Sequence, residues 1–165
     1  MARSCFFSFH YQPDSWRASK VRNIGKIEGN TPARDNDWET VTGGGDAAIK
    51  RWIENQMKGR SCTVVLIGSN TAGRKWITHE ISESWNKNMG VVGIHINKIT
   101  DRFDQQSLKG ANPLDHVTFK QSKAKLSGVA RTYTPSGTTS PQVYASISAN
   151  IADWVEEAIA IRKAN

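Results

Sequence analysis

The chain has 165 residues, of which 38% are hydrophobic and 22% charged, a composition typical of a globular protein and not of a disordered one. This length fits a single domain, 1–165, and no apolar run approaches the ~20 residues of a membrane span, so we expect no membrane partner. The net charge of +7 favours anionic partners, but the basic residues are dispersed along the chain, and we therefore do not expect nucleic acid as a partner.

The N-terminus and the cysteines point to a reducing compartment. The apolar segment within residues 1–10 is too short for a signal peptide and is closed by Pro13, so we expect a cytoplasmic protein. Cys5 and Cys62 lie in apolar, strand-like runs, which predicts two buried, reduced thiols; a disulfide would need neighbouring strands, and a cytosolic setting disfavours it. Neither cysteine has a metal-ligand spacing, and the histidines are scattered singly, which predicts no metal site.

The first element is an aromatic strand over Ser4–Phe9, which we expect near the centre of the sheet. It runs directly into His10 and Tyr11, so polar and aromatic side chains gather at the carboxyl end of the strand. Ser8, Phe9, His10 and Tyr11 are therefore candidate ligand contacts, although Phe9 is equally suited to the core.

A helix over residues 14–24 is expected next, with Asp14 as its N-cap and Trp16, Val21 and Ile24 as its apolar positions. The irregular segment 25–45 reads as a long loop of the kind that is functional or mobile, and its three glycines lack the Gly-Lys-Ser/Thr ending of a phosphate-binding loop. A second helix is predicted over residues 46–57 from its apolar spacing.

The centre of the chain predicts a strand, a loop and a helix. Cys62–Ile67 is a β-branched run of strand length, apolar enough to be buried on both faces of a parallel sheet. A small polar segment, 68–73, follows, and a helix is predicted over 76–88, ending before Gly90.

Glu80 is the main functional candidate of this helix. At about 100° per residue, Ile77 and Ile81 share an apolar stripe, and Trp76 and Glu80 lie on its shoulder. The position is noteworthy because ligands of open α/β sheets bind outside the carboxyl ends of the strands. A structural alternative is that Glu80 favours the positive end of the helix or pairs with Arg74 or Lys75.

The remaining segments complete an α/β pattern. Residues 91–96 form another buried strand, in which His95 is expected to be an interior histidine, and residues 97–113 read as a loop with a weak helix. A late strand pair is predicted within 116–133, and apolar residues at steps of three and four predict a long helix over 143–161. Alternation of strands and helices predicts an α/β fold with a doubly wound, mostly parallel sheet of about five strands flanked by helices.

Several ordered blocks of the chain resemble one family. Residues 76–81, Trp-Ile-Thr-His-Glu-Ile, resemble the Trp-Cys-x-x-Glu-Leu signature of TIR domains, and Ser4–Phe9 resembles their first-strand box. The segments 6–11, 21–23, 65–69, 93–97 and 109–115 resemble the TIR-like ThsB proteins of the bacterial Thoeris antiphage system. Ile77 replaces the common cysteine, Ser4 replaces the usual acidic residue, and 34–37 lacks the Pro-Gly that serves receptor-style assembly.

The resemblance implies a flavodoxin-like topology and an enzyme that cleaves the nicotinamide–ribose bond of NAD and closes the product into a cyclic ADP-ribose isomer. That product would signal to a separate effector protein, and the enzyme would be activated by a trigger, through homo-oligomerisation. NAD would be the substrate, with no metal and no further cofactor. Glu80 matches the catalytic glutamate of the family. The candidate substrate-binding residues are Ser8, Phe9, His10, Tyr11, Trp38, Ser69 and Trp76.

Two other function classes fit the same chain. A non-catalytic TIR assembly module has the same expected fold, and it differs in whether Glu80 lines an open pocket or is locked in a surface ion pair. A basic nucleotide-binding or nucleic-acid-binding α/β domain would show steeply salt-dependent binding.

Overall fold

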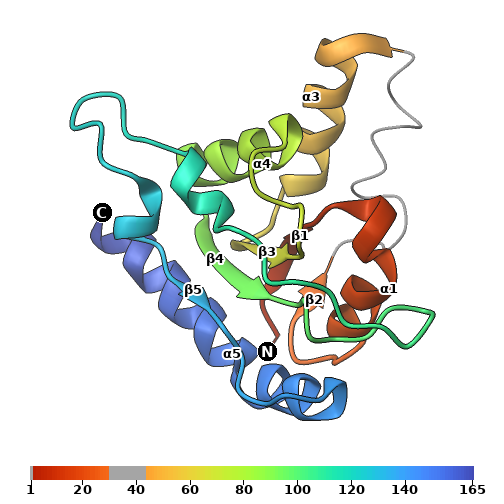
Figure 1. Cartoon of the computed structure of the whole chain (residues 1–165). Coiled ribbons are helices and arrows are strands. Elements are labelled where there is room, and N and C mark those ends of the chain that lie inside the picture. The colour runs from red at the N-terminus through yellow and green to blue at the C-terminus, as the bar shows by residue number, and fades with distance from the viewer. Residues whose placement is uncertain (1, 30–43) are drawn as a thin grey trace.

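A five-stranded sheet forms the centre of the computed structural model, which describes residues 2–29 and 44–165 (Figure 1). All neighbouring strands pair in parallel. Their order across the sheet is β2 (Glu28–Gly29), β1 (Ser4–Ser8), β3 (Cys62–Ile67), β4 (Gly90–His95) and β5 (Thr132–Tyr133). This 2-1-3-4-5 order is the flavodoxin-like arrangement and confirms the predicted fold class.

Helices cover both faces of the sheet. Figure 1 shows α3 (Gly45–Met57) and α4 (Lys75–Asn86) together on one side, with α5 (Ser140–Ala164) on the other. Alternate side chains of β1 enter two separate cores: Phe7 packs on the side of α5 and α1 (Tyr11–Arg22), and Phe6 packs on the side of α3 and α4. Burial on both faces explains why the strands are continuous apolar runs rather than alternating ones.

The chain reverses its direction across the sheet between β1 and β3. From β1 it crosses through α1 to β2 on one side, and from β3 it crosses through α4 to β4 on the other. Such a switch point leaves a space between two loops at the carboxyl ends of the strands, which is where ligands of doubly wound sheets bind.

Helix α1 differs from its prediction at its N-terminal end. It begins at Tyr11 with His10 as its N-cap, so the predicted capping role of Asp14 is wrong. Asp14, Ala18 and Val21 instead form the buried face of the helix, and Trp16, predicted as an apolar packing position, is 51% exposed. The spacing of these buried residues, four and then three, turns Trp16 away from the core.

The connection between β4 and β5 also differs from its prediction. Two short 3-10 helices, η3 (Pro113–His116) and η4 (Leu126–Gly128), place Leu114 and Leu126 in the core of the α4 side. The predicted strand pair within 116–133 is wrong, because the described structure has only an isolated antiparallel bridge between Thr118 and Lys125 and the short β5. A tight turn, in which Lys123 has a φ of 61°, connects the two sides of this bridge.

The two cysteines are neighbours across the sheet. Cys5 of β1 is in register with Cys62 of β3, and both are buried, free thiols. Contact with the Cys5 thiol and burial raise the pKa of Cys62 well above its ordinary value, which keeps this thiol protonated and unreactive. Within 2–29 and 44–165, no helix is long and apolar enough to cross a membrane.

Candidate active site at the ends of β1 and β3

The site lies where the sheet has its switch point. Ser8 is the last residue of β1, and Gly68 directly follows β3. Ser8 is in register with Val65, so β3 continues to Ile67 beyond the end of its neighbour. The start of α1 and the first turns of α4 therefore meet this edge from opposite faces of the sheet.

Glu80 is held at this edge by a hydrogen bond from Ser8. The Ser8 Oγ donates to the Glu80 Oε1 at 2.6 Å, across 72 positions of sequence, and both residues are 0% exposed. A buried carboxylate is stable only where donors replace its water, and a short hydrogen bond to a charged acceptor is a strong one. The structure thus joins the predicted catalytic residue to one of the predicted contacts.

Helix α4 is fastened to the sheet next to Glu80. The Ser84 Oγ lies 2.6 Å from the Glu80 backbone oxygen and 2.5 Å from the Thr63 Oγ1 of β3, and Ser84 and Thr63 are both fully buried. These hydrogen bonds fix the height of the helix over the strand. Lys75, one of the ion-pair partners considered for Glu80, pairs with Asp46 at 2.6 Å on the surface. The Glu80 carboxylate is in the interior and is not open to solvent.

The candidate residues that follow β1 differ in their burial. Phe9 is buried in the core on the α1 side, with Tyr11 packed against it at 6.3 Å between ring centroids. His10 is half-buried, and its Nδ1 has no hydrogen-bond partner in the described part of the chain. Burial, and then the charge of Arg74, lower the pKa of His10, so the ring is neutral at pH 7. A neutral imidazole at the strand end can donate or accept one hydrogen bond from a ligand.

The other candidates have mixed placements. Ser69 follows β3, is half-buried and lines a cavity of about 600 Å³ at the same edge. Trp76 is half-buried and contacts neighbours on its own helix, with His79 edge-on at 5.5 Å and the Lys75 ammonium 4.8 Å from its ring centroid. Trp38 lies outside the described residues.

Asp14 and Arg17 are part of this edge, and the sequence prediction missed them. Asp14 is 1% exposed; its Oδ1 accepts a 3.0 Å hydrogen bond from Arg17, and its Oδ2 has no hydrogen-bond partner among the described residues. A Cβ added to Gly68 would lie 2.0 Å from that Oδ2, so only glycine fits beneath the carboxylate. Burial raises the pKa of Asp14 despite the Arg17 charge. The sequence did contain a signal for this pair: an acidic and a basic residue three positions apart on a predicted helix can form an ion pair.

The 97–112 segment lies across the same edge. A Cβ on Gly110 would lie 2.2 Å from the Gly68 backbone oxygen, which shows how closely the two loops approach. In the ranges that the structure describes, no three His, Cys, Asp or Glu side chains are grouped as metal ligands.

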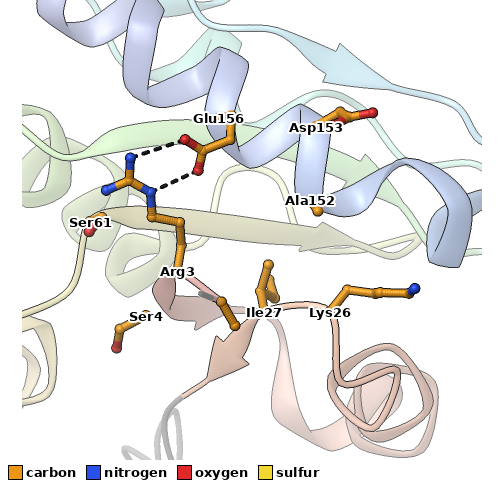
Figure 2. Close-up of a pocket in the computed structure, with 9 residues that line it drawn as sticks. Arg3, Ser4, Lys26, Ile27, Ser61, Ala152, Asp153 and Glu156 are labelled. Atoms are coloured by element: carbon orange, nitrogen blue, oxygen red, sulfur yellow. Dashed lines mark hydrogen bonds and ion pairs between the residues drawn. The ribbon is translucent and has the colours of Figure 1, made fainter.

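A second cavity lies at the opposite edge of the sheet. Figure 2 shows Arg3 directed at Glu156, with which it makes two hydrogen bonds of 2.8 and 3.0 Å, in a cavity also lined by Ser4, Ser61 and Lys26. Ser4 begins β1 and Ser61 precedes β3, so this cavity is at the amino ends of the strands. It is remote from Glu80, and its exposed ion pair contributes little energy. We therefore place the candidate site at the carboxyl edge.

Replacing Ser8 tests how far Glu80 depends on this hydrogen bond. We expect Ser8→Ala to lower the free energy of unfolding by about 1.5–3 kcal/mol, because a buried charged acceptor loses a donor. Ser69→Ala, at the half-buried residue after β3, should change it by less than about 0.5 kcal/mol. Urea unfolding at pH 7 measures both, and equal stability of Ser8→Ala and the parent chain would contradict the role of the hydrogen bond.

His95, at the end of β4, makes stability depend on pH. It is 6% exposed, and burial, with a smaller contribution from Lys109, lowers its pKa from 6.5 to about 4. As the pH falls below 6.5, His95 becomes protonated in the unfolded chain, whereas in the folded chain it stays neutral until about pH 4. The free energy of unfolding therefore decreases over that pH range. We expect the loss to be about 1–2 kcal/mol between pH 7 and 4.5.

The matching variant is His95→Gln, which cannot take up that proton. Urea unfolding of the two chains at pH 7 and pH 4.5 compares their losses, and the variant should lose less by about the same 1–2 kcal/mol. An identical loss in both chains would show that His95 does not titrate between the two pH values.

Comparison with known proteins places these features in a family. The model of the Thoeris protein ThsB, TIR-like domain, matches residues 6–101, more than half of the chain. The "Putative cyclic ADP-D-ribose synthase ThsB1" of Bacillus cereus (strain MSX-D12) is 38% identical over 127 residues, which are 74% of this chain and 66% of that relative. The chain thus spans just under two thirds of the relative's length. The matched region includes the last three residues of β1, all of β3 and β4, and the Ser8–Glu80 pair, and the chain belongs to the TIR-like domain family of the Thoeris protein ThsB.

Proposed function

We propose that this chain is an enzyme that cleaves NAD at its nicotinamide–ribose bond and closes the product into a cyclic ADP-ribose isomer. The observation that carries the proposal is the Glu80 carboxylate held by Ser8 at the switch point of the sheet. Two further findings support it: the family match covers this pair, and the name of the 38% identical relative describes a cyclic ADP-D-ribose synthase.

The chemistry suits a single fixed carboxylate. When the bond between the ribose C1 and the nicotinamide nitrogen breaks, both electrons go to the pyridinium ring, which leaves as neutral nicotinamide. The ribose becomes oxocarbenium-like, and an anion beside C1 stabilises it. A nucleophile of the same molecule then bonds to C1 and releases a proton, which gives a cyclic product, whereas attack by water gives linear ADP-ribose. We assign the anion to Glu80, with NAD as substrate and no metal or further cofactor.

The remaining candidates have supporting roles in this proposal. Ser8 orients the carboxylate through its hydrogen bond. His10, neutral and with a free ring nitrogen in the described part, is placed to hydrogen-bond a ribose hydroxyl. Phe9 is 2% exposed, so we assign it to the core and not to ring stacking.

The burial of Glu80 has a consequence for activity. A carboxylate with 0% exposure cannot reach a substrate unless groups above it move. We therefore propose that the isolated chain is a resting state and that association with other copies opens the site. In the cell, the cyclic product would activate a separate effector protein as an antiphage signal.

Nicotinamide release from NAD by the purified chain tests the function. The assay should cover a wide range of protein concentration, with the adenine-containing product identified by mass. We expect activity per molecule to rise with concentration, and a product lighter than linear ADP-ribose by one water. If no nicotinamide is released at any concentration, or in lysate from phage-infected cells, the non-catalytic assembly module becomes the better interpretation.

A further inference from the structure

A second feature of the carboxyl edge is the cavity of about 600 Å³ beside Ser69. It lies between the first turns of α1 and the 101–107 loop, which Figure 1 shows in green reaching across to α1. Helices α1 and α4 cover opposite faces of the sheet. The cavity beside α1 and the Glu80 side chain of α4 therefore lie at the same strand ends but on opposite faces. Its volume is within the range of small-molecule sites.

Two exposed aromatic side chains line this cavity. Trp16 of α1 is 51% exposed, and Phe103 of the loop is 67% exposed. In the described part of the chain, four large hydrophobic side chains are exposed, and these two share one cavity. Exposed apolar side chains that gather in one place mark a binding site. The sequence predicted that Trp16 packs in the core, but the side chain is exposed. Differences between the local sequence pattern and the structure are concentrated at functional sites.

The loop that carries Phe103 is fixed by hydrogen bonds. The Asp101 Oδ1 accepts from the backbone N–H of Phe103 at 2.9 Å and of Gln105 at 3.0 Å. From the other side of the cavity, Arg17 donates to the backbone oxygens of Ile99 at 2.7 Å and of Gln105 at 2.8 Å. The exposure of Phe103 is therefore built into the loop, and a ligand would meet a preorganised wall.

The charge and polarity of the cavity indicate its ligand. Arg17 is paired with Asp14 and Asp101, whereas the exposed Arg102 has its guanidinium 4.6 Å from the Phe103 ring centroid. The Ser107 Oγ is buried and has no hydrogen-bond partner within the described residues. Aromatic walls and one exposed guanidinium suit a flat base that is attached to a phosphate.

We propose that this cavity binds the adenine nucleotide half of the dinucleotide. The base lies against Trp16 and Phe103, its phosphate faces Arg102, and the nicotinamide half extends across the strand ends to Glu80. The inference rests on the proposed function for the identity of the substrate, and it assigns a subsite that Glu80 does not line. A dinucleotide carries two rings joined through phosphates, so it needs a second ring subsite at this edge.

Calorimetric titration of the full chain with AMP, and separately with nicotinamide mononucleotide, tests the subsite. We expect Trp16→Ala and Phe103→Ala each to weaken AMP binding by about 5- to 100-fold, the effect of losing one base–aromatic stack. Any binding of nicotinamide mononucleotide should be the same in all chains, because Trp16 and Phe103 line the cavity and not the closed Glu80 site. Leu108→Ala is the matched control, because Leu108 directly follows the loop, is 84% exposed and does not line the cavity, and it should change AMP binding less than about twofold.

The outcomes separate the subsite from the catalytic proposal. Failure of the parent chain to bind AMP, or equal AMP affinity in the parent, Trp16→Ala and Phe103→Ala, overturns the subsite, even if NAD cleavage depends on Glu80. AMP binding that requires Trp16 and Phe103 supports the subsite, even if Glu80→Gln leaves nicotinamide release unchanged and the catalytic proposal fails. Phe103 is exposed on a loop, so its variant gives a result even if Trp16→Ala does not fold.

Discussion

Glu80→Gln is expected to lower nicotinamide release by about a thousandfold or more, equivalent to about 4 kcal/mol of transition-state stabilisation. The amide has the size of the carboxylate and keeps an oxygen that can accept the hydrogen bond from Ser8, which lies 2.6 Å from the Glu80 Oε1. It lacks the negative charge that would face the oxocarbenium-like ribose. The variant should therefore fold like the parent chain but lose nearly all of its NAD cleavage.

The control for this experiment is on the same helix. Glu83 is in α4, three positions after Glu80, but it is only half-buried, whereas Glu80 is fully buried and accepts the hydrogen bond from Ser8. Glu83→Gln removes the same charge from the same helix and should retain activity within about twofold. The assay is nicotinamide release at the highest protein concentration that the parent chain tolerates, with far-ultraviolet circular dichroism to establish folding. More than a tenth of parental activity in folded Glu80→Gln would exclude Glu80 as the stabilising anion.

Arg17→Ala is expected to give the largest loss of stability, about 3–5 kcal/mol at pH 7. The side chains of Arg17 and Asp14 are 5% and 2% exposed, so the substitution leaves a buried carboxylate without its counter-charge. It also removes the hydrogen bonds that tie α1 to Ile99 and Gln105. A loss of this size is a large share of the 5–15 kcal/mol that typically holds a domain folded.

The pH dependence of this loss identifies its cause. Without Arg17, Asp14 can remain buried only by binding a proton, and burial already raises its pKa in the intact chain. The deficit of Arg17→Ala relative to the parent should therefore be greatest at pH 7 and shrink toward pH 5. Urea unfolding at both pH values measures it.

Lys20→Ala is the comparison on the same helix. Lys20 is also partly buried and bonds to Thr100 through its ammonium, but among residues 2–29 and 44–165 it is not paired with a buried carboxylate. We expect a cost of about 0.5–1.5 kcal/mol that does not change between pH 7 and pH 5. A deficit of Arg17→Ala that is equally independent of pH would mean that lost packing, and not the stranded charge of Asp14, causes it.

The sequence by itself determined the three central strands of the sheet and most of the helices. Cys62–Ile67 is recognisable because a strand buried on both faces must be apolar throughout, and α4 and α5 because a helix on a sheet repeats its apolar residues at its own period. Those are local requirements, and the alternation of the elements then limits the topology to a doubly wound sheet. Glu80 was also found in this way, from its place in a helix that follows a strand.

Only the tertiary structure decided which side chains meet at the edge of the sheet. Ser8 and Glu80 come together because β1 and β3 are neighbours, a fact of strand order that no local pattern contains. Asp14 was expected to cap a helix, yet it is buried because Gly68, directly after β3, leaves room for its carboxylate and Arg17 neutralises it. Trp16 is exposed for a related reason: those buried partners fix the rotation of α1. Local propensity sets where elements form, and contacts between distant residues set which faces they bury.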